Sequence, residues 1–392
     1  MKIAVFMDSF KGSLTSVEAG EAVKEGILMA DDQTLVRIFP FADGGEGTLE
    51  AFLAAGGRKE IVRVSDPLGR RVGACYGILE DGTCVIESAK AIGLCLLTET
   101  ERNPLYTSSR GLGELIVAAA REGARNFIIG IGGSSVNDCG IGMLQALGFE
   151  IRNENGEHVT EGAKGLGEAA SITNEHAMSG LRQCHFTIAC DVENPLCGEN
   201  GASMVYGMQK GASKKQCQMM DRWMRNYSEL VKKTYPQADP DDPGAGAAGG
   251  LGFAMRTFLS GKMRSGADLL FEKIKAEEAI CECDLVITGE GRIDGQTAMG
   301  KAPVRIASLA KKYQKPVIAF AGCMGKGGEI CYKKGIDAII PITDDTLSLE
   351  EAMKKDVAYK NLSLAARQAM YRIFADNSYR KVSGNNLRKT IC

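Results

Sequence analysis

Several residue types that often mark a functional class are scarce in this chain of 392 residues. It has only three histidines and one tryptophan. His158, His176 and His185 lack the spacing of a metal site, so we expect all three to be structural. Trp223 lies in a methionine-rich stretch, QMMDRWM, which predicts the packing face of an amphipathic helix.

Charge of one sign and long apolar runs are also lacking. The formal net charge is −2 and neither end carries a long basic block, which argues against a nucleic-acid or membrane-surface role. No apolar run approaches the ~20 residues that a membrane span needs. The start, MKIAVFMD, predicts a strand and lacks the layout of a signal peptide. We therefore expect a cytoplasmic protein.

Cysteine is plentiful, but its pattern fits neither a disulfide framework nor a zinc site. The thirteen cysteines are odd in number and irregularly spaced. Cys281 and Cys283 are separated by one residue, which is not zinc-ribbon spacing. Cys95, Cys190 and Cys323 lie in apolar stretches, where cysteine acts as a small hydrophobe. A reducing compartment fits best.

Five glycine-rich segments carrying acidic, basic or hydroxyl residues are the most informative feature. Glycine lets backbone amides approach an anion, and carboxylates hold Mg²⁺ or accept a hydroxyl proton, a combination that indicates phosphoryl transfer. The segments are DSFKGS (Asp8–Ser13), ADGGEG (Ala42–Gly47), GIGGSSVNDCG (Gly130–Gly140), GAGAAGGLG (Gly244–Gly252) and TGEGRIDGQT (Thr288–Thr297).

The chain is longer than one hydrophobic core supports, and strands alternate with helices along it. We expect an α/β fold of two domains: a Rossmann-like parallel-sheet domain of residues 1–64 and 282–392, interrupted by an inserted α/β domain of residues 65–281. Ligands of α/β proteins collect at the carboxyl ends of strands, so we expect the active site in the cleft between the domains.

Local signals predict individual elements. Thr15 and Glu18 have capping-box spacing, which predicts a helix over residues 16–29. Residues 75–79 and 83–87 flank Glu80-Asp81-Gly82 and predict a hairpin. The segments DLVIT, PVIAFA and AIIPI are apolar enough for buried parallel strands, and we expect TGEGRIDGQT to be the loop after the first of these.

Each glycine segment also has a structural interpretation. Lys11 in the first is as consistent with a solvated turn as with an anion site. Asp43 and Glu46 fit a ligand better than a helix start, since acids and glycines recur together elsewhere. Asn137 and Asp138 are nearly as consistent with a helix cap as with a nucleotide site. The alternative for GAGAAGGLG, a flexible linker, is weakened by its apolar alanines and leucine.

Taken together and in order, the segments resemble the bacterial glycerate kinases that act on D-glycerate. The matching stretches include DSFKGS, ADGGEGT, GIGGSSVNDCG, ACDVENPLCG, PGAGAAGGLG and ITGEGRIDGQ, and the resemblance extends to about residue 375. Two departures are Ser135-Val136, where Ala-Thr is usual, and Cys139, where glycine is usual. The resemblance implies phosphorylation of D-glycerate by ATP with Mg²⁺, more often giving 2-phosphoglycerate than 3-phosphoglycerate.

From the residues and the resemblance together we assign roles. Asp191 follows a strand in the inserted domain and is the expected base, with Lys11 as the second catalytic group. Mg²⁺ is expected on Asp43, Glu290 and Asp294. The expected substrate-binding residues are Asp8, Ser9, Lys11, Ser13, Asp43, Glu46 and Arg292. The expected nucleotide-binding residues are Gly132, Gly133, Ser134, Ser135, Asn137, Asp138, Gly246, Gly249 and Gly250.

Two other functions are weighed against this one. A dinucleotide-dependent oxidoreductase would need G-x-G-x-x-G after the first strand, which DSFKGS does not supply. A non-enzymatic protein that binds or senses small anions would keep the glycines without needing several acids at strand ends. The expected partners are D-glycerate and ATP, with no nucleic acid and no membrane, and a homodimer is left open.

Overall fold

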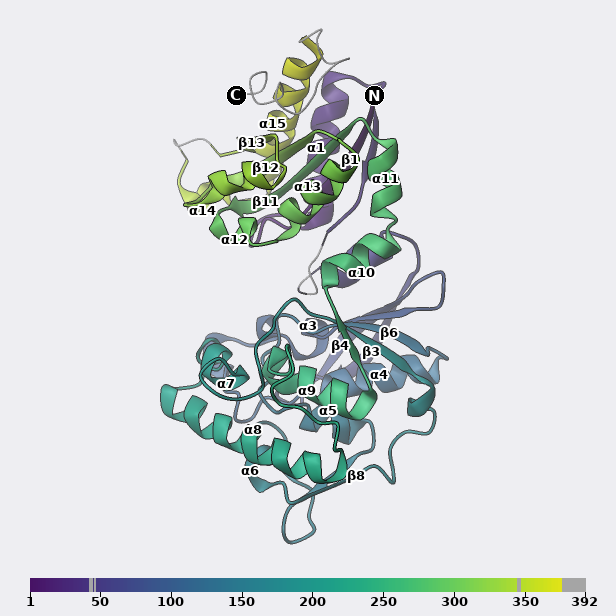
Figure 1. The fold of residues 1–392 in the computed structure, drawn as a ribbon, viewed down its shortest axis with the longest axis vertical. Helices are drawn as coiled ribbons and strands as arrows, with labels where there is room; N and C mark the ends of the chain where they lie inside the picture. The colour runs from purple at the N-terminus through teal and green to yellow at the C-terminus, as the bar shows by residue number, and fades with distance from the viewer. Residues whose placement is uncertain (42–44, 46, 344–346, 376–392) are drawn as a thin grey trace. The chain divides into compact units, whose positions relative to one another are not determined.

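The computed structural model describes residues 1–41, 45, 47–343 and 347–375, which form two compact units (Figure 1). Unit 1 is drawn from Met1–Asp43, Glu50–Ala55 and Ala267–Cys392, and unit 2 from Gly44–Leu49 and Gly56–Gly266. The units change near residues 55 and 266, whereas the sequence placed the boundaries after residues 64 and 281. Strand pairing explains the first difference, because β3 (Arg58–Ser65) pairs along its whole length with β4 (Arg71–Ile78) of unit 2.

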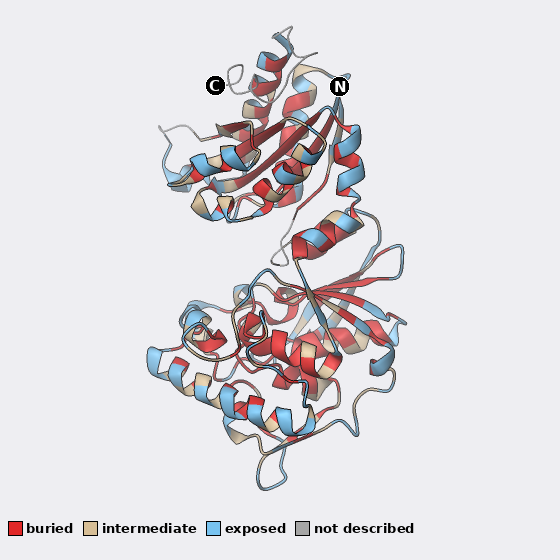
Figure 2. Ribbon diagram, viewed as in Figure 1, coloured by how far each residue is buried: buried red, intermediate tan, exposed pale blue. Residues whose placement is uncertain are grey.

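Unit 1 is built on a five-stranded sheet in which every pairing is parallel. Its strand order is β13-β12-β11-β1-β2. Long β-branched and aromatic runs form these strands, and most of their residues are buried (Figure 2). The strands are β1 (Lys2–Met7), β2 (Leu35–Ile38), β11 (Leu285–Ile293), β12 (Val317–Met324) and β13 (Ala338–Pro341).

Helices cover the sheet of unit 1. Helices α1 and α15 pack against each other and share a core with alternate side chains of β1, while α13 contacts β11 and β1 (Figure 1). The helices are α1 (Ser16–Ala30), α10 (Gly266–Lys273), α11 (Ala276–Glu282), α12 (Gly295–Ala298), α13 (Ala302–Lys312), α14 (Leu349–Ala352) and α15 (Lys355–Ala375), with the 3₁₀-helix η5 (Gly328–Lys334); α2 (Thr48–Leu53) lies at the boundary of the units.

Unit 2 is built on a six-stranded mixed sheet with the order β10-β9-β6-β5-β4-β3. The four strands from β10 to β5 are parallel, whereas β5, β4 and β3 pair antiparallel. The remaining strands are β5 (Cys84–Glu87), β6 (Asn126–Gly130), β9 (His185–Ala189) and β10 (Lys262–Arg264), with β7 (Glu150–Arg152) and β8 (Ser171–Thr173) forming a separate pair.

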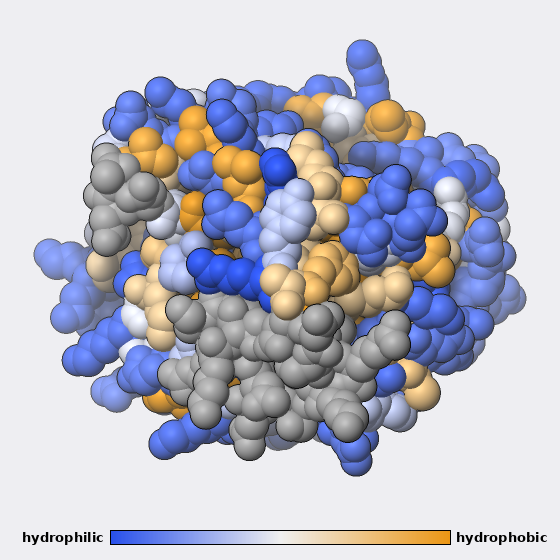
Figure 3. All heavy atoms as spheres, turned by 90° about the horizontal axis from the view of Figure 1, so that it is seen from above, coloured by the Kyte–Doolittle hydropathy of each residue, from blue (hydrophilic) through white to orange (hydrophobic). Residues whose placement is uncertain are grey.

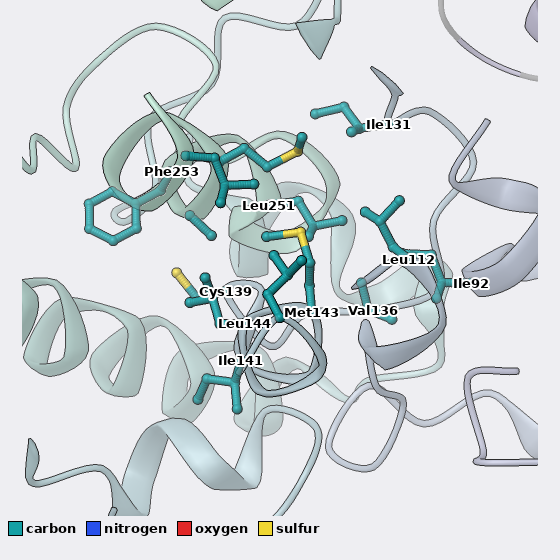
Figure 4. Close-up of a cluster of buried hydrophobic side chains, with 14 of the residues drawn as sticks. Ile92, Leu112, Ile131, Val136, Cys139, Ile141, Met143, Leu144, Leu251 and Phe253 are labelled. Carbon is teal, nitrogen blue, oxygen red and sulfur yellow. The ribbon is translucent and has the colours of Figure 1, made fainter. Parts of the chain in front are cut away.

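One apolar core joins the helices of unit 2 to its sheet. Figure 4 shows part of it, where Val136, Cys139, Met143 and Leu251 meet. Trp223 is partly buried and packs against this core, as its sequence context predicted. The helices are α3 (Ala89–Ile92), α4 (Arg110–Arg121), α5 (Ile141–Ala146), α6 (Lys164–Glu168), α7 (Ala202–Tyr206), α8 (Lys214–Thr234) and α9 (Ala247–Leu259), with η1 (Leu94–Leu96), η2 (Glu99–Glu101), η3 (Leu181–Gln183) and η4 (Met208–Lys210).

The fold confirms the predicted α/β class with two units and parallel pairing. The capping box is present, since Thr15 Oγ1 accepts from the Glu18 amide and Glu18 Oε2 accepts from the Thr15 amide. The predicted hairpin is β4–β5. On the face drawn in Figure 3, hydrophilic side chains predominate. Among the helices of the described residues, none is long and apolar enough to cross a membrane.

Candidate functional site

The loop after β1 lies against β11. The N–H of Asp8 donates to the carbonyl of Gly289 (2.9 Å), which extends the contact between the two strands by one residue. A Cβ atom on Gly291 would lie 3.3 Å from Cα of Phe10, so the loop passes directly over this glycine. The segments that carry Asp8 and Glu290 therefore meet at the carboxyl ends of neighbouring parallel strands.

Lys11 lies exposed at the tip of this loop. The amide of Phe10 donates to the carbonyl of Leu14 (2.8 Å), and the amide of Leu14 donates back (3.0 Å), while both side chains are buried. The turn between them places Gly12 at a φ of +77°, which favours glycine. Ser13 Oγ is buried and has no hydrogen-bond partner in the described chain. A fixed turn thus presents the ammonium group to solvent.

The second predicted loop of this unit is only partly described. Asp43 and Glu46 lie outside the described residues, so their predicted roles in binding substrate and metal stay predictions. The chain leaves β2 at the same end of the sheet as the Asp8 loop, because the Phe41 amide donates to the carbonyl of Met7 (3.2 Å).

The expectation that TGEGRIDGQT is a loop after a strand is wrong for its first half. Strand β11 continues to Ile293, and Glu290 pairs with Ala321 and Arg292 with Cys323 of β12. Glycine at position 289 permits this, since a Cβ atom there would lie 2.3 Å from the Phe320 carbonyl oxygen. Glu290 is therefore held by the sheet rather than by a loop.

Glu290 is a buried carboxyl group among other charges. Its side chain is 7% exposed, and burial raises its pKa to about 7. A hydrogen bond from the Thr297 hydroxyl (2.5 Å) and the charge of Lys301 oppose that rise, whereas the charges of Asp8 and Asp294 add to it. Two other acids and one lysine thus lie within electrostatic reach of Glu290.

Asp294 follows β11 and begins α12. One carboxylate oxygen accepts from the Gln296 amide (2.9 Å), and the other lies 3.5 Å from Nε of Arg292. Arg292 itself is largely exposed. Asp294 therefore combines a helix cap with an ion pair, which leaves it less free for a ligand than Glu290.

The residues at the end of β11 fit Mg²⁺ in kind. Within the described part of the chain no three Asp, Glu, His or Cys side chains form a group that could hold a metal. Mg²⁺ is usually bound by one or two carboxylates, with waters and substrate phosphates completing its shell. Glu290 and Asp294 meet that requirement without a third protein ligand.

In unit 2, the segment after β6 is tied into the core. Ser135 donates both its amide and its hydroxyl to the carbonyl of Ile92 (2.9 Å each). Asp138 is fully buried and accepts from the Ser109 amide and hydroxyl and from the Gly140 and Gly142 amides, at 2.8–3.3 Å. Burial raises the pKa of Asp138, although these hydrogen bonds oppose the rise.

These contacts explain much of GIGGSSVNDCG without a ligand. Asn137 is also fully buried and donates to Ser203 Oγ (2.9 Å). Cys139 has a φ of +50°, a conformation that favours glycine, so glycine suits this position. The part of the predicted nucleotide site that remains near the surface is Gly132, Gly133 and, at 7% exposure, Ser134.

The glycines of GAGAAGGLG serve close packing. Gly249 and Gly250 have positive φ values in a kink at the start of α9. A Cβ atom on Gly249 would lie 2.2 Å from the Val136 carbonyl oxygen, and one on Gly246 would lie 2.1 Å from that of Pro195. The start of α9 therefore packs against the segments that follow β6 and β9.

Asp191 is exposed and follows β9. The amide of Cys190 donates to the carbonyl of Arg264 (3.0 Å), so the backbone is held by β10 up to the residue before it. Asp191 and the Gly132–Ser134 turn thus follow two adjacent parallel strands, β9 and β6. This placement agrees with a role in chemistry and does not test it.

Three polar residues near these segments were missed by the sequence interpretation. Thr297 donates to Glu290, and the charge of Lys301 lowers the pKa of Glu290, as described above. Lys210, on η4, is 3% exposed and donates to the Val136 carbonyl (2.7 Å) and to Ser134 Oγ (3.4 Å). Burial lowers its pKa to about 8, and the charge of Asp138 opposes that shift. The sequence around Lys210 gives no signal that it is buried.

The similarity to known proteins covers nearly the whole chain. The fold belongs with α/β proteins built on parallel sheets, and a crystal structure of a candidate glycerate kinase 2 from Salmonella typhimurium LT2 superposes with a TM-score of 0.84 at 39% identity, covering 96% of this chain and 98% of that one. The model of the glycerate kinase family matches residues 3–374.

Relatives with assigned names agree. A glycerate 2-kinase of Escherichia coli (strain K12) is 43% identical over 369 residues, which covers 94% of this chain and 96% of the relative. A glycerate kinase of Bacillus subtilis (strain 168) is 42% identical over 361 residues, covering 92% and 94%. The chain therefore belongs to the glycerate kinase family and is a kinase.

Proposed function

We propose that this kinase transfers the γ-phosphoryl group of ATP to the 2-hydroxyl of D-glycerate in the cytoplasm. The observation that carries the proposal is the match to the glycerate kinase family over residues 3–374. Transfer to the 2-position is supported by the name of the Escherichia coli relative, a glycerate 2-kinase. The prediction that the substrates bind between the two units, and the oligomeric state, stay predictions.

The reaction forms a bond between the glycerate oxygen and the γ-phosphorus and breaks the bond from that phosphorus to the β–γ bridging oxygen. Asp191, exposed beyond β9, accepts the proton of the attacking hydroxyl. Lys11, on its fixed turn, binds the glycerate carboxylate or the transferred phosphate, with Asp8, Ser9, Ser13 and Arg292 around it. Mg²⁺, when bound, neutralises the phosphate charge that develops during transfer.

The nucleotide is proposed to contact unit 2 at the Gly132–Ser134 turn. Gly133 is exposed and has a φ of +71°, which turns the backbone at the end of a parallel strand. Turns of this kind, at the carboxyl ends of strands, are where α/β proteins bind phosphate groups. Asp138 and Asn137, which are buried and follow this turn in the sequence, would hold it in position.

The direct test is ADP release when the protein is mixed with ATP, Mg²⁺ and D-glycerate. Phosphorus and proton NMR of the product distinguish the 2-phosphate from the 3-phosphate. We expect ADP release with D-glycerate and the 2-phosphate as product. No ADP release from folded protein that still binds the substrates would favour a small-anion-binding or sensing protein on the same scaffold.

The role of Asp191 is tested by Asp191→Asn. Loss of the proton acceptor should lower kcat by about 100-fold or more with a modest effect on KM. Glu193→Gln is the matched control, since Glu193 is also exposed, two residues along the same segment. Near-normal turnover of Asp191→Asn would contradict the assignment.

The metal assignment is tested by titrating Mn²⁺ into Glu290→Ala, Asp294→Ala and Asp43→Ala. Because Glu290 is less engaged in other bonds than Asp294, we expect its removal to weaken Mn²⁺ binding more. Unchanged affinity in all three variants would exclude this group as the metal site.

A further inference from the structure

The hydroxyl of Thr297 lies between the two acids proposed to hold the metal. Thr297 is fully buried in α12, and its Oγ1 donates to Glu290 Oε1 at 2.5 Å. The same oxygen accepts the amide of Asp294 at 3.0 Å. The side chain of Thr297 thus connects the end of β11 to the start of α12.

The direction of both hydrogen bonds follows from the chemistry of a hydroxyl, which has one proton to donate. The Asp294 amide can only donate, so it occupies a lone pair of Oγ1. With its carboxyl group ionised, as metal binding requires, Glu290 can only accept, so the proton of Thr297 goes to Glu290 Oε1. Among the described residues no hydrogen bond reaches Oε2, which leaves that oxygen for a ligand.

The backbone keeps Thr297 in place. The amide of Gly295 donates to the carbonyl of Lys326 (3.1 Å), and the amide of Gly325 donates to the carbonyl of Ile293 (2.8 Å). These bonds attach the end of β11 and the start of α12 to the segment that follows β12. Since the sheet holds Glu290 and this network holds Thr297, the short bond between them fixes the orientation of the carboxyl group.

We propose that Thr297 is a positioning residue for the kinase, because its hydroxyl orients Glu290 so that Oε2 faces the metal–phosphate group. The inference rests on the proposed function and on the role given there to Glu290. The proposal adds Thr297, which contacts neither substrate and acts through the metal-binding side chain of Glu290. Removing the hydroxyl leaves Glu290 free to rotate and should weaken the metal site.

The experiment compares Thr297→Val, Thr297→Ser and Thr288→Val. Valine keeps the shape of threonine and removes the hydroxyl, whereas serine keeps the hydroxyl. Thr288 is a matched control, since it is also fully buried, on β11, and its hydroxyl has no hydrogen-bond partner in the described chain. Mn²⁺ affinity is measured by electron paramagnetic resonance with ADP present, and kcat and KM by ADP release.

Hydrogen bonds to charged groups are worth about 1.5–3 kcal/mol, which corresponds to roughly tenfold to 100-fold in affinity. We expect Thr297→Val to weaken Mn²⁺ binding at least about tenfold and to lower kcat, with little change in KM for D-glycerate. Thr297→Ser and Thr288→Val should stay within about twofold of the wild type in both measurements.

Two outcomes overturn the proposal. One is equal Mn²⁺ affinity in folded Thr297→Val and Thr288→Val. The other is a folded Thr297→Ser that loses as much Mn²⁺ affinity as Glu290→Ala, because packing of the methyl group would then matter rather than the hydroxyl. The serine variant tests the proposal even if Thr297→Val does not fold. A wild type that binds Mn²⁺ but releases no ADP with D-glycerate would instead contradict the proposed function.

Discussion

Glu290 in unit 1 and Asp138 in unit 2 are both buried carboxyl groups beside glycines, and they differ in the hydrogen bonds they accept. Asp138 accepts four, from three backbone amides and the Ser109 hydroxyl. Glu290 accepts one from the described residues, that of Thr297. A carboxylate has about four lone-pair sites, so Asp138 is saturated by the protein and Glu290 is not.

This difference separates a structural acid from one available for chemistry. A saturated carboxylate fixes the segments that surround it and gains nothing from a ligand. Burial raises the pKa of both acids, but only the unsaturated one keeps unused acceptors for a ligand, which is the condition expected of a functional group. Both acids have a glycine within two residues in the sequence, so the sequence does not tell them apart and their availability to a ligand depends on the fold.

Asp138→Ala should have the largest effect of the variants that test this comparison, and the effect should be a loss of stability. Each buried donor left without its charged acceptor lowers the free energy of unfolding by about 1–3 kcal/mol. Because some of the four donors will find other partners, we expect a total loss of about 4 kcal/mol. Trp223 is the only tryptophan of the chain and lies in unit 2, so its fluorescence in urea reports on this unit. A loss below about 1 kcal/mol would break the comparison.

Glu290 should respond to pH instead. Its pKa is raised from 4.5 to about 7 in the folded protein, so the folded state holds a proton that the unfolded state releases. The stability that this proton contributes is fully present below about pH 4.5 and is lost as the pH rises through 7, which lowers the free energy of unfolding by roughly 3 kcal/mol. Calorimetry in EDTA should show wild type losing stability relative to Glu290→Gln over this range; parallel curves would contradict the shifted pKa.

Lys210 in unit 2 should make the dependence of stability on pH run in the opposite direction. Its pKa falls from 10.5 to about 8 on folding, so the unfolded state binds the proton more tightly between these values. Stability from this group therefore rises with pH, by about 2 kcal/mol between pH 7 and 9.5. Urea unfolding followed by Trp223 fluorescence should show wild type gaining on Lys210→Met over that range. A constant difference between the two proteins would mean that Lys210 stays charged throughout.

How much the sequence revealed depends on whether the signal was local. The helix after Thr15 follows from neighbouring residues and was predicted with its correct first residue, Ser16, and the strand predicted in MKIAVFMD is β1. Strand β11 was cut short because Gly-Glu-Gly-Arg is typical of turns, whereas its pairing with β12 depends on a distant segment. Lys210 was missed for the same reason, since it reaches its partners across the fold.

The candidate site divides in the same way. The glycine motifs and the family resemblance identified the segments of Asp8 and Glu290, which the fold brings together. The sequence could not show that Asp138 and Ser135 form hydrogen bonds within the core, because their partners Ser109 and Ile92 are distant in the chain. Segments were thus predictable, and the direction of individual side chains was not.

The smallest expected effect concerns Lys11, an exposed member of the unit 1 site. One charge-assisted hydrogen bond to an anion is worth about 1.5 kcal/mol, so Lys11→Ala should raise KM for D-glycerate, ATP or both by about tenfold, with kcat changed less. Lys312→Ala is the control, since Lys312 is also exposed and lies in α13, outside the predicted site. Lys11→Arg should recover part of the affinity, because it keeps the charge but not the shape of the ammonium group. The effect should shrink at high salt, where exposed charges are screened. Kinetic constants equal to those of the control would make Lys11 a solvated turn residue without a role in binding either substrate.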